Sequence, residues 1–158
     1  MRAKGQAALE YLMTYGWALV VIIIVVAALF ALGILSPATY QGSTCRGFGK
    51  IGYSDHAFDA SDFNITLYNG TGADILSGNA TVYVDCDNDG TYEINKATTA
   101  SWRGSTSYTF NIDASGNADC NGSSWSTGDT YNMEVKITYT PRGKFTKTET
   151  ARCTGVVG

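Results

Sequence analysis

The order of hydrophobic and polar residues divides the chain into two parts. Residues 11–35 contain no charged side chain, whereas the sequence from Ser36 onward is rich in Gly, Thr, Ser and Asn. As a helix, the 25 uncharged positions would extend roughly 38 Å, which is longer than a bilayer core of roughly 30 Å. The pattern therefore predicts one continuous helix over residues 6–35 that can span a membrane.

Two local features decide the type and the end of this segment. The β-branched run Val20–Val26 would be tolerated as a strand in water, but an isolated strand in lipid would leave its backbone groups unpaired. A helix is therefore expected. Pro37 disfavours a helical conformation at Ser36, so the helix should end near Leu35.

In the second part, apolar and polar residues alternate with a period of two. Six segments with this alternation and many β-branched or aromatic residues are predicted to be strands: 63–69, 80–86, 91–94, 107–112, 131–139 and 145–150. Turn-forming residues separate them, and residues 37–51 are expected to form a connection. The fold class is therefore predicted to be α+β, a long N-terminal hydrophobic helix followed by an all-β antiparallel head of the sandwich or barrel-like kind.

The segment 131–139 predicts a core face. One side of this strand would carry Tyr131, Met133, Val135, Ile137 and Tyr139. The other side would carry polar residues, so one face should be buried and one solvated. We expect this strand near the centre of its sheet.

Charge indicates orientation and excludes one class of partner. The net charge of −3 and the pI of about 5.0 give no basic surface for nucleic acid. Arg2 and Lys4 precede the apolar segment, and no basic residue follows it until Arg46. The positive-inside tendency then places the N-terminus in the cytoplasm and the head outside the cell.

Four cysteines, all in the second part, support an exterior location. An even number of cysteines in an exported domain predicts two disulfides, with buried free thiols as the alternative. Three pairings are possible, and we favour Cys45–Cys153, which would tie the start of the head to its end, with Cys86–Cys120. The spacings match no zinc motif, and His56 is the only histidine.

Four N-x-S/T sequons occur in the second part and none before it. They are Asn64, Asn69, Asn79 and Asn121. Together they predict a glycosylated surface on the head.

An acidic stretch at residues 85–93 has the spacing of a calcium-binding loop. Asp85, Asp87 and Asp89 alternate before Gly90, and Glu93 occupies the ninth position. Hard oxygen ligands at this spacing suit calcium, with the Thr91 carbonyl as a fifth ligand. The alternative is a hairpin turn without a metal. No other cofactor is expected.

No catalytic arrangement is indicated. His56, beside Asp55, is expected to be an exposed or turn histidine, and no Ser–His–Asp or Cys–His combination can be argued from it. The chain is therefore not expected to be an enzyme. The basic segment 142–147, with Arg152, is expected to be a solvated face or a contact between adjacent heads.

The N-terminus resembles archaeal type IV pilins with a class III signal peptide. The matching residues are Lys4, Gly5, Gln6, Glu10 and Tyr11, with Ala8 where the family often has Ser. The resemblance covers about a fifth of the chain. It implies that a prepilin peptidase cuts after Gly5. Three regions follow: a leader at 1–5, a helix at 6–36 that anchors the precursor and later forms the filament core, and an extracellular head at 37–158.

In function, the resemblance implies a structural subunit of an extracellular adhesion filament that polymerises with copies of itself. Other implied partners are the pilus assembly ATPase, its membrane platform and, before assembly, the membrane. In this family the acid matching Glu10 is thought to meet the N-terminal amine of a neighbouring subunit, here that of Gln6.

Two alternatives stay open. The first is an archaellum-type filament subunit, although archaellins usually have a Gly- and Thr-rich start after the cut site, and this chain has QAALEY. The second is a monomeric, membrane-anchored or secreted glycosylated binding module. In that module Glu10 would be an ordinary flank of the membrane anchor, or an ordinary signal would be cut near residues 36–38.

Overall fold

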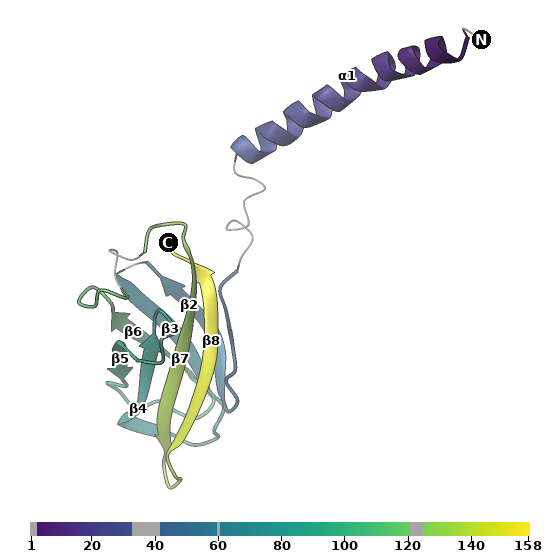
Figure 1. The fold of residues 1–158 in the computed structure, drawn as a ribbon. Coiled ribbons are helices and arrows are strands. Elements are labelled where there is room, and N and C mark those ends of the chain that lie inside the picture. The colour runs from purple at the N-terminus through teal and green to yellow at the C-terminus, as the bar shows by residue number, and fades with distance from the viewer. Residues whose placement is uncertain (1–2, 33–41, 60, 121–124) are drawn as a thin grey trace. The chain divides into compact units, whose positions relative to one another are not determined.

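The computed structural model describes residues 3–32, 42–59, 61–120 and 125–158 (Figure 1). Of residues 3–9 and 12 it describes the backbone alone. The chain forms two compact units, residues 1–40 and residues 41–158, which are treated separately below.

The first unit is the helix α1 (Ala3–Ala31), whose 29 residues carry no charge from position 11 onward. The Leu32 amide still donates to the Ala28 carbonyl at 2.9 Å, which closes the last described turn. The predicted helix is therefore present. It begins three residues earlier than expected, and residues 33–35, its expected last turn, lie outside the described part of the chain.

The second unit, called the head, consists of two antiparallel sheets (Figure 1). Its strands are β1 (Thr44–Arg46), β2 (Ile51–Phe58), β3 (Asp62–Asn69), β4 (Ile75–Asp85), β5 (Ile94–Ala97), β6 (Ser107–Asp113), β7 (Thr130–Pro141) and β8 (Lys147–Val156). One sheet has the order β1-β8-β7-β4-β5 and the other has the order β2-β3-β6. This arrangement confirms the predicted fold class, a hydrophobic helix followed by an all-β antiparallel head.

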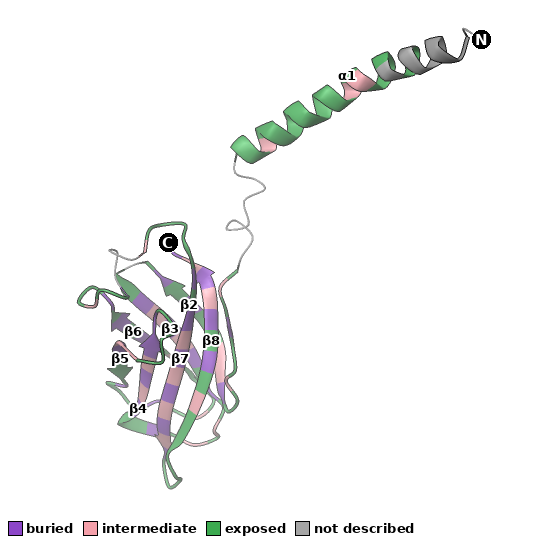
Figure 2. Cartoon of the chain, viewed as in Figure 1, coloured by how far each residue is buried: buried purple, intermediate pink, exposed green. Residues whose placement is uncertain are grey.

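The core lies between the sheets, and β7 supplies much of it. As predicted, β7 is the central strand of its sheet, and its residues 131, 133, 135, 137 and 139 are all buried. Phe63, Ile65 and Leu67 face this core from β3 and are fully buried. Figure 2 shows the resulting alternation of buried positions with half-buried or exposed ones along β7 and β8. Each such side chain contributes about 1.5–3 kcal/mol on burial, so this alternation holds the sheets together.

Several predicted strand limits were wrong. Strands β1 and β2 lie where the sequence predicted a connection or a loop, and a bulge between Tyr53 and Asp55 interrupts the alternation of β2. The predicted strand 91–94 is displaced to Ile94–Ala97, because residues 86–93 form a loop. Strand β8 continues to Val156, well beyond the predicted limit at 150.

Two disulfides stabilise the head. Cys45–Cys153 joins β1 to β8, and Cys86–Cys120 joins the loop after β4 to the segment after β6. These are the pairings favoured from the sequence. The two cysteines of the first disulfide are 108 residues apart in the sequence, and those of the second are 34 residues apart.

The strands give the head two opposite ends, visible in Figure 1 as the β7–β8 turn and the C-terminus. The hairpin end, where the β7–β8 turn lies, comprises four connections: 47–50, 70–74, 98–106 and 142–146. The entry end, where Gly42 and Ser43 lead into β1, comprises the described residues of three other connections: 59 and 61, 86–93, and 114–120 with 125–129. Twelve residues of β7 separate the two ends.

Candidate functional site

The residues that resemble the pilin motif lie in the first three turns of α1. The backbone of Lys4, Gly5 and Gln6 is helical, and the structure does not describe their side chains. Glu10 is exposed, and its backbone carbonyl accepts a hydrogen bond from Thr14 Oγ1 at 2.8 Å. Residues four apart lie one turn apart on the same helix face, so positions 6 and 10 share a face.

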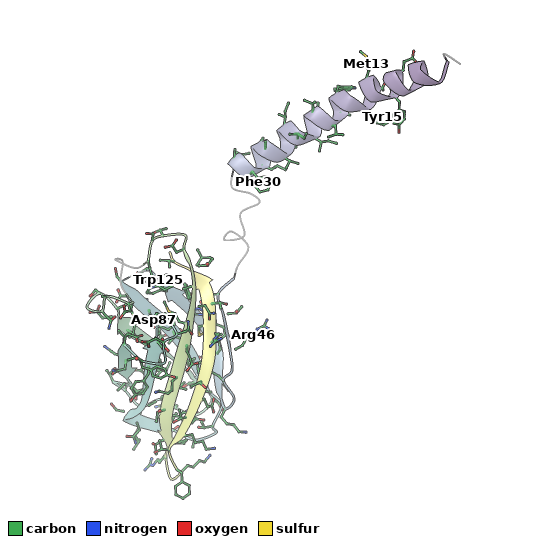
Figure 3. All side chains as sticks on the ribbon, viewed as in Figure 1. Met13, Tyr15, Phe30, Arg46, Asp87 and Trp125 are labelled. Carbon is green, nitrogen blue, oxygen red and sulfur yellow. A yellow bond between two sulfur atoms is a disulfide. The ribbon has the colours of Figure 1, made fainter. Side chains whose placement is uncertain are left out.

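Apolar side chains surround the rest of α1. The segment Met13–Ala31 is long and apolar enough to cross a membrane, and none of its side chains is buried. Figure 3 shows Met13, Tyr15 and Phe30 projecting from the helix. An apolar surface of this extent needs a lipid or protein environment. Together with the two disulfides, it indicates a protein directed to a membrane or beyond the cytoplasm.

The acidic loop at the entry end brings together the four predicted metal ligands. One carboxylate oxygen from each of Asp85, Asp87, Asp89 and Glu93 lies within 4.8 Å of the others. Asp85, buried at the end of β4, accepts hydrogen bonds from the backbone amides of Asn88 at 2.7 Å and Gly90 at 2.9 Å.

The loop also closes on itself. Asp87 Oδ1 accepts from the Asp89 amide at 3.1 Å, and Asp89 Oδ1 accepts from the Thr91 amide at 2.7 Å. Gly90 has a φ of 93°, a left-handed conformation in which a glycine is favoured. These bonds fit both the metal loop and the plain turn, the two interpretations that the sequence leaves open.

Glu93 distinguishes this loop from a fully solvated turn. Its Oε2 accepts from the Cys86 amide at 2.8 Å. Burial raises the pKa of Glu93, and the charges of Asp85 and Asp87 raise it further, against the hydrogen bonds from backbone amides. A hard divalent cation would relieve the repulsion between these three carboxylates. A set of oxygen donors suits calcium better than zinc.

The four sequons have different environments. Asn64 is half-buried on β3, Asn79 is exposed on β4, and Asn121 lies outside the described residues. Asn69 is fully buried, and its Nδ2 donates to the carbonyls of Ala73, Trp102 and Arg103 at 3.0, 3.3 and 3.2 Å. A glycan would be attached through that nitrogen, so the prediction of a glycan on Asn69 is wrong for the folded head. The side chain instead holds the 70–74 and 98–106 connections together.

The prediction for His56 was also wrong. Its side chain is 4 % exposed, lies on β2 and faces the Cys45–Cys153 disulfide, with Nδ1 3.5 Å from Cys45 Sγ. Nδ1 also lies 2.8 Å from Tyr53 Oη. Burial lowers the pKa of His56 to about 4, although Asp55 opposes the shift, so the ring is neutral near pH 7. Because the neighbouring sulfurs are joined in a disulfide, they offer no thiolate for catalysis.

At the hairpin end, the structure assembles a group of cationic residues that the sequence only partly indicated. Lys50, which lies far from the β7–β8 turn in sequence, joins Lys144 and Lys147 around a shallow pocket of about 180 Å³. Arg152, which the sequence analysis grouped with this turn, lies elsewhere on β8 and pairs with Glu134 at 3.9 Å. Only the tertiary fold brings Lys50 to the other two lysines.

Comparison with known proteins found no family model that matches this chain and no curated protein that is significantly similar to it. An exposed apolar N-terminal helix followed by antiparallel sheets is nevertheless consistent with a pilin-like fold.

Proposed function

We propose that this chain is a structural subunit of an extracellular filament of the archaeal type IV pilus kind. The observation that carries the proposal is the Lys4–Gly5–Gln6 site with Glu10 four residues after Gln6, at the start of a helix that has an apolar surface and no buried side chain between Met13 and Ala31. Such a helix can lie in a bilayer as a precursor and then be covered by identical helices in a bundle. The head would coat the outside of that bundle and provide adhesion.

Glu10 is proposed to set the axial position of each subunit. Cleavage between Gly5 and Gln6 would create an α-amine, which has a pKa near 7.7 and is mostly charged at neutral pH. A lone carboxylate near the middle of a bilayer costs about 3 kcal/mol. In a helical bundle, pairing Glu10 of one subunit with the amine of its neighbour would offset both desolvated charges and favour one register.

Small residues would allow the helices to pack closely. Along the described helix, the positions without a large side chain include Gly16, Ala18, Ala27, Ala28 and Ala31. Small residues let backbones approach, which favours helix association by close packing. The sequence of α1 thus supports assembly as well as membrane anchoring.

A pair of substitutions at one position tests the proposal. Glu10→Gln removes the charge but keeps the shape, and Glu10→Asp keeps the charge on a shorter side chain. Glu10→Gln should insert into membranes like the wild-type chain yet give far fewer sheared filaments, whereas Glu10→Asp should retain more. Wild-type filament yield from Glu10→Gln would contradict the proposed role.

The rival function is a monomeric, membrane-anchored binding module. The exposed apolar helix fits that function equally well, because a single anchor is also covered by lipid. The rival gives no role to the Lys4–Gly5–Gln6 site or to the acid four residues after Gln6. It predicts an uncleaved chain that stays monomeric, so the Glu10 variants would behave alike.

A further inference from the structure

The two ends of the head carry opposite charge. The connections at the entry end contain six acidic residues and no lysine or arginine: Asp59, Asp87, Asp89, Glu93, Asp119 and Asp129. Three further acids occupy strand ends on the same side: Asp62, Asp85 and Asp113. The entry end is therefore a strongly anionic surface, on which Asp87 is labelled in Figure 3.

The hairpin end is cationic. Its connections carry four basic residues, and Lys147 begins β8 beside them; the four are Lys50, Arg103, Arg142 and Lys144. Five of the nine lysines and arginines of the head thus lie at one end. Within the described part of the chain, the one ion pair is Arg152–Glu134, so none of these five cations has a carboxylate within 4.0 Å.

Two acids at this end of the head, Glu149 and Asp74, have other partners. Glu149 accepts hydrogen bonds from the backbone amides of Gly49 and Lys50 at 2.7 and 3.0 Å. It also accepts from Tyr139 Oη at 2.5 Å. Asp74 Oδ1 accepts from the Gly104 amide at 2.9 Å. These carboxylates hold the backbone in place and leave the lysine ammonium groups available for an external anion.

The cationic end also has a defined shape. Lys50, Lys144 and Lys147 surround the pocket of about 180 Å³, and Lys144 Nζ is positioned by donating to the Thr71 carbonyl at 3.0 Å. Phe145, in the turn, is 92 % exposed. Aromatic side chains are enriched at protein interfaces, and burial of the Phe145 ring against a partner would be favourable.

We propose that the hairpin end of one head docks on the entry end of a second copy of this chain. A second copy fits because one molecule carries both halves of the contact, a cationic pocket at one end and anionic loops at the other. Such a head-to-tail contact is heterologous, and it generates an open chain of heads unless the rotation between successive copies closes a ring. This inference rests on the proposed function. In a filament of parallel helices all heads would point the same way, so the hairpin end of one head could meet the entry end of another.

The length of the head makes the contact easy to test. The 12 residues of β7 span roughly 40 Å at about 3.3 Å per residue. A bond formed without a spacer between the two ends therefore cannot arise within one head. Any such bond reports two copies.

The experiment is carbodiimide coupling of amines to carboxylates, followed by peptide mass spectrometry, on protein that a chelator has freed of metal ions and from which the chelator has then been removed. It is applied to sheared filaments and, separately, to concentrated full-length chain in detergent. We expect Lys50 or Lys144 coupled to Asp87, Asp89 or Asp129. In detergent-solubilised protein, the yield should fall as salt rises, because exposed charges are screened.

Matched variants test whether the coupling depends on the charges of the two ends. Lys144→Glu with Lys147→Glu leaves the Lys50 amine in place and should lower the yield of the Lys50 couplings roughly fivefold or more, since each lost or reversed pair removes part of the attraction. Asp87→Asn with Asp89→Asn keeps side-chain oxygens that can accept the turn hydrogen bonds, and it should lower the yield of coupling to the unchanged Asp129. Lys96→Glu, on β5 near Asp113, makes a charge change of the same kind outside the hairpin end, so it should not lower the yield.

The outcomes separate the two proposals. Filaments that lack couplings between the ends, or couplings that the Lys144 and Lys147 changes leave intact, would overturn the docking inference while the filament function stands. The absence of filaments would count against the proposed function, and couplings in the solubilised chain would still support docking. Couplings absent from both samples, with an added acidic polysaccharide protecting Lys144 from modification, would assign the cationic end to a polymer ligand and overturn self-docking.

Discussion

Cys45 and Cys153 lie directly opposite each other on the antiparallel strands β1 and β8 and are joined by a disulfide, with their Cα atoms 4.0 Å apart. Through this bond the first strand of the head is fixed to the last. Because β1 has only three residues, its backbone pairing with β8 alone would be weak, and the disulfide stabilises it.

The two disulfides should differ in their contribution to stability. Loop-closure entropy predicts about 4.8 kcal/mol for the 108-residue separation and about 3.8 kcal/mol for the 34-residue separation. Replacing Cys45 and Cys153 by Ala should therefore cost about 1 kcal/mol more than replacing Cys86 and Cys120. Denaturant unfolding of both double variants measures this, and the opposite order would show that native packing outweighs loop length.

Stability should fall in mild acid because of His56. Its pKa is lowered from 6.5 to about 4 in the folded head, so the unfolded chain binds the proton more readily. The contribution of the neutral His56 ring to the free energy of unfolding is fully present above pH 6.5. It is lost as the pH falls from 6.5 towards 4, and the loss reaches up to about 3 kcal/mol.

The control for this prediction is His56→Phe. Tyr53 Oη keeps a hydrogen-bond acceptor in that variant, because it also lies 3.1 Å from the Ser43 carbonyl. The free energy of unfolding of His56→Phe should change less between pH 6.5 and 4.5 than that of the wild type. Equal pH dependence of the two proteins would mean that other groups are responsible.

Asn69 should carry no glycan and should be essential to the fold. Glycopeptide analysis of the native protein should find position 69 unmodified. Asn69→Ala would leave the carbonyls of Ala73, Trp102 and Arg103 without this donor and should cost about 2–4 kcal/mol. The exposed Asn79→Ala is the control and should change stability by less than about 0.5 kcal/mol. A glycan on Asn69 would require a different arrangement of this end of the head.

Calcium should stabilise the head if the carboxylates of residues 85–93 act as its ligands. A single site at a calcium concentration 100 times Kd adds about 2.7 kcal/mol. The melting temperature should then rise more with calcium than with magnesium, and Asp87→Asn with Asp89→Asn should abolish the difference. Equal effects of the two ions would favour the plain turn.

The parts of the fold that were predicted correctly are those with a strong local pattern. The uninterrupted apolar run of α1 can pair its backbone groups in a bilayer only as a helix, and the strict alternation of Tyr131–Tyr139 puts the apolar side chains on one face of a strand. Strand β2 was missed because polar residues and the bulge at Tyr53 break its alternation. Strand β1 was missed because three residues form a strand only through their pairing with β8.

The site predictions divide in the same way. The spacing of Asp85, Asp87 and Asp89 is local, so the loop that gathers them could be predicted from the sequence. The sequon at Asn69 is also local, but its burial depends on carbonyls more than 30 residues away. Lys50 likewise reaches Lys144 and Lys147 only through the sheet packing, and no pattern in the sequence connects them.

The central claim, that the chain is processed and assembled as a pilin, is tested most directly by peptide mass spectrometry on protein sheared from the surface of cells. The account predicts a mature N-terminus at Gln6 in that fraction, with the α-amine that Glu10 is proposed to meet. A surface chain that begins at Met1, or one cut near residue 39, would lack that amine in the required place. Either result would contradict the filament function and favour the membrane-anchored or secreted module.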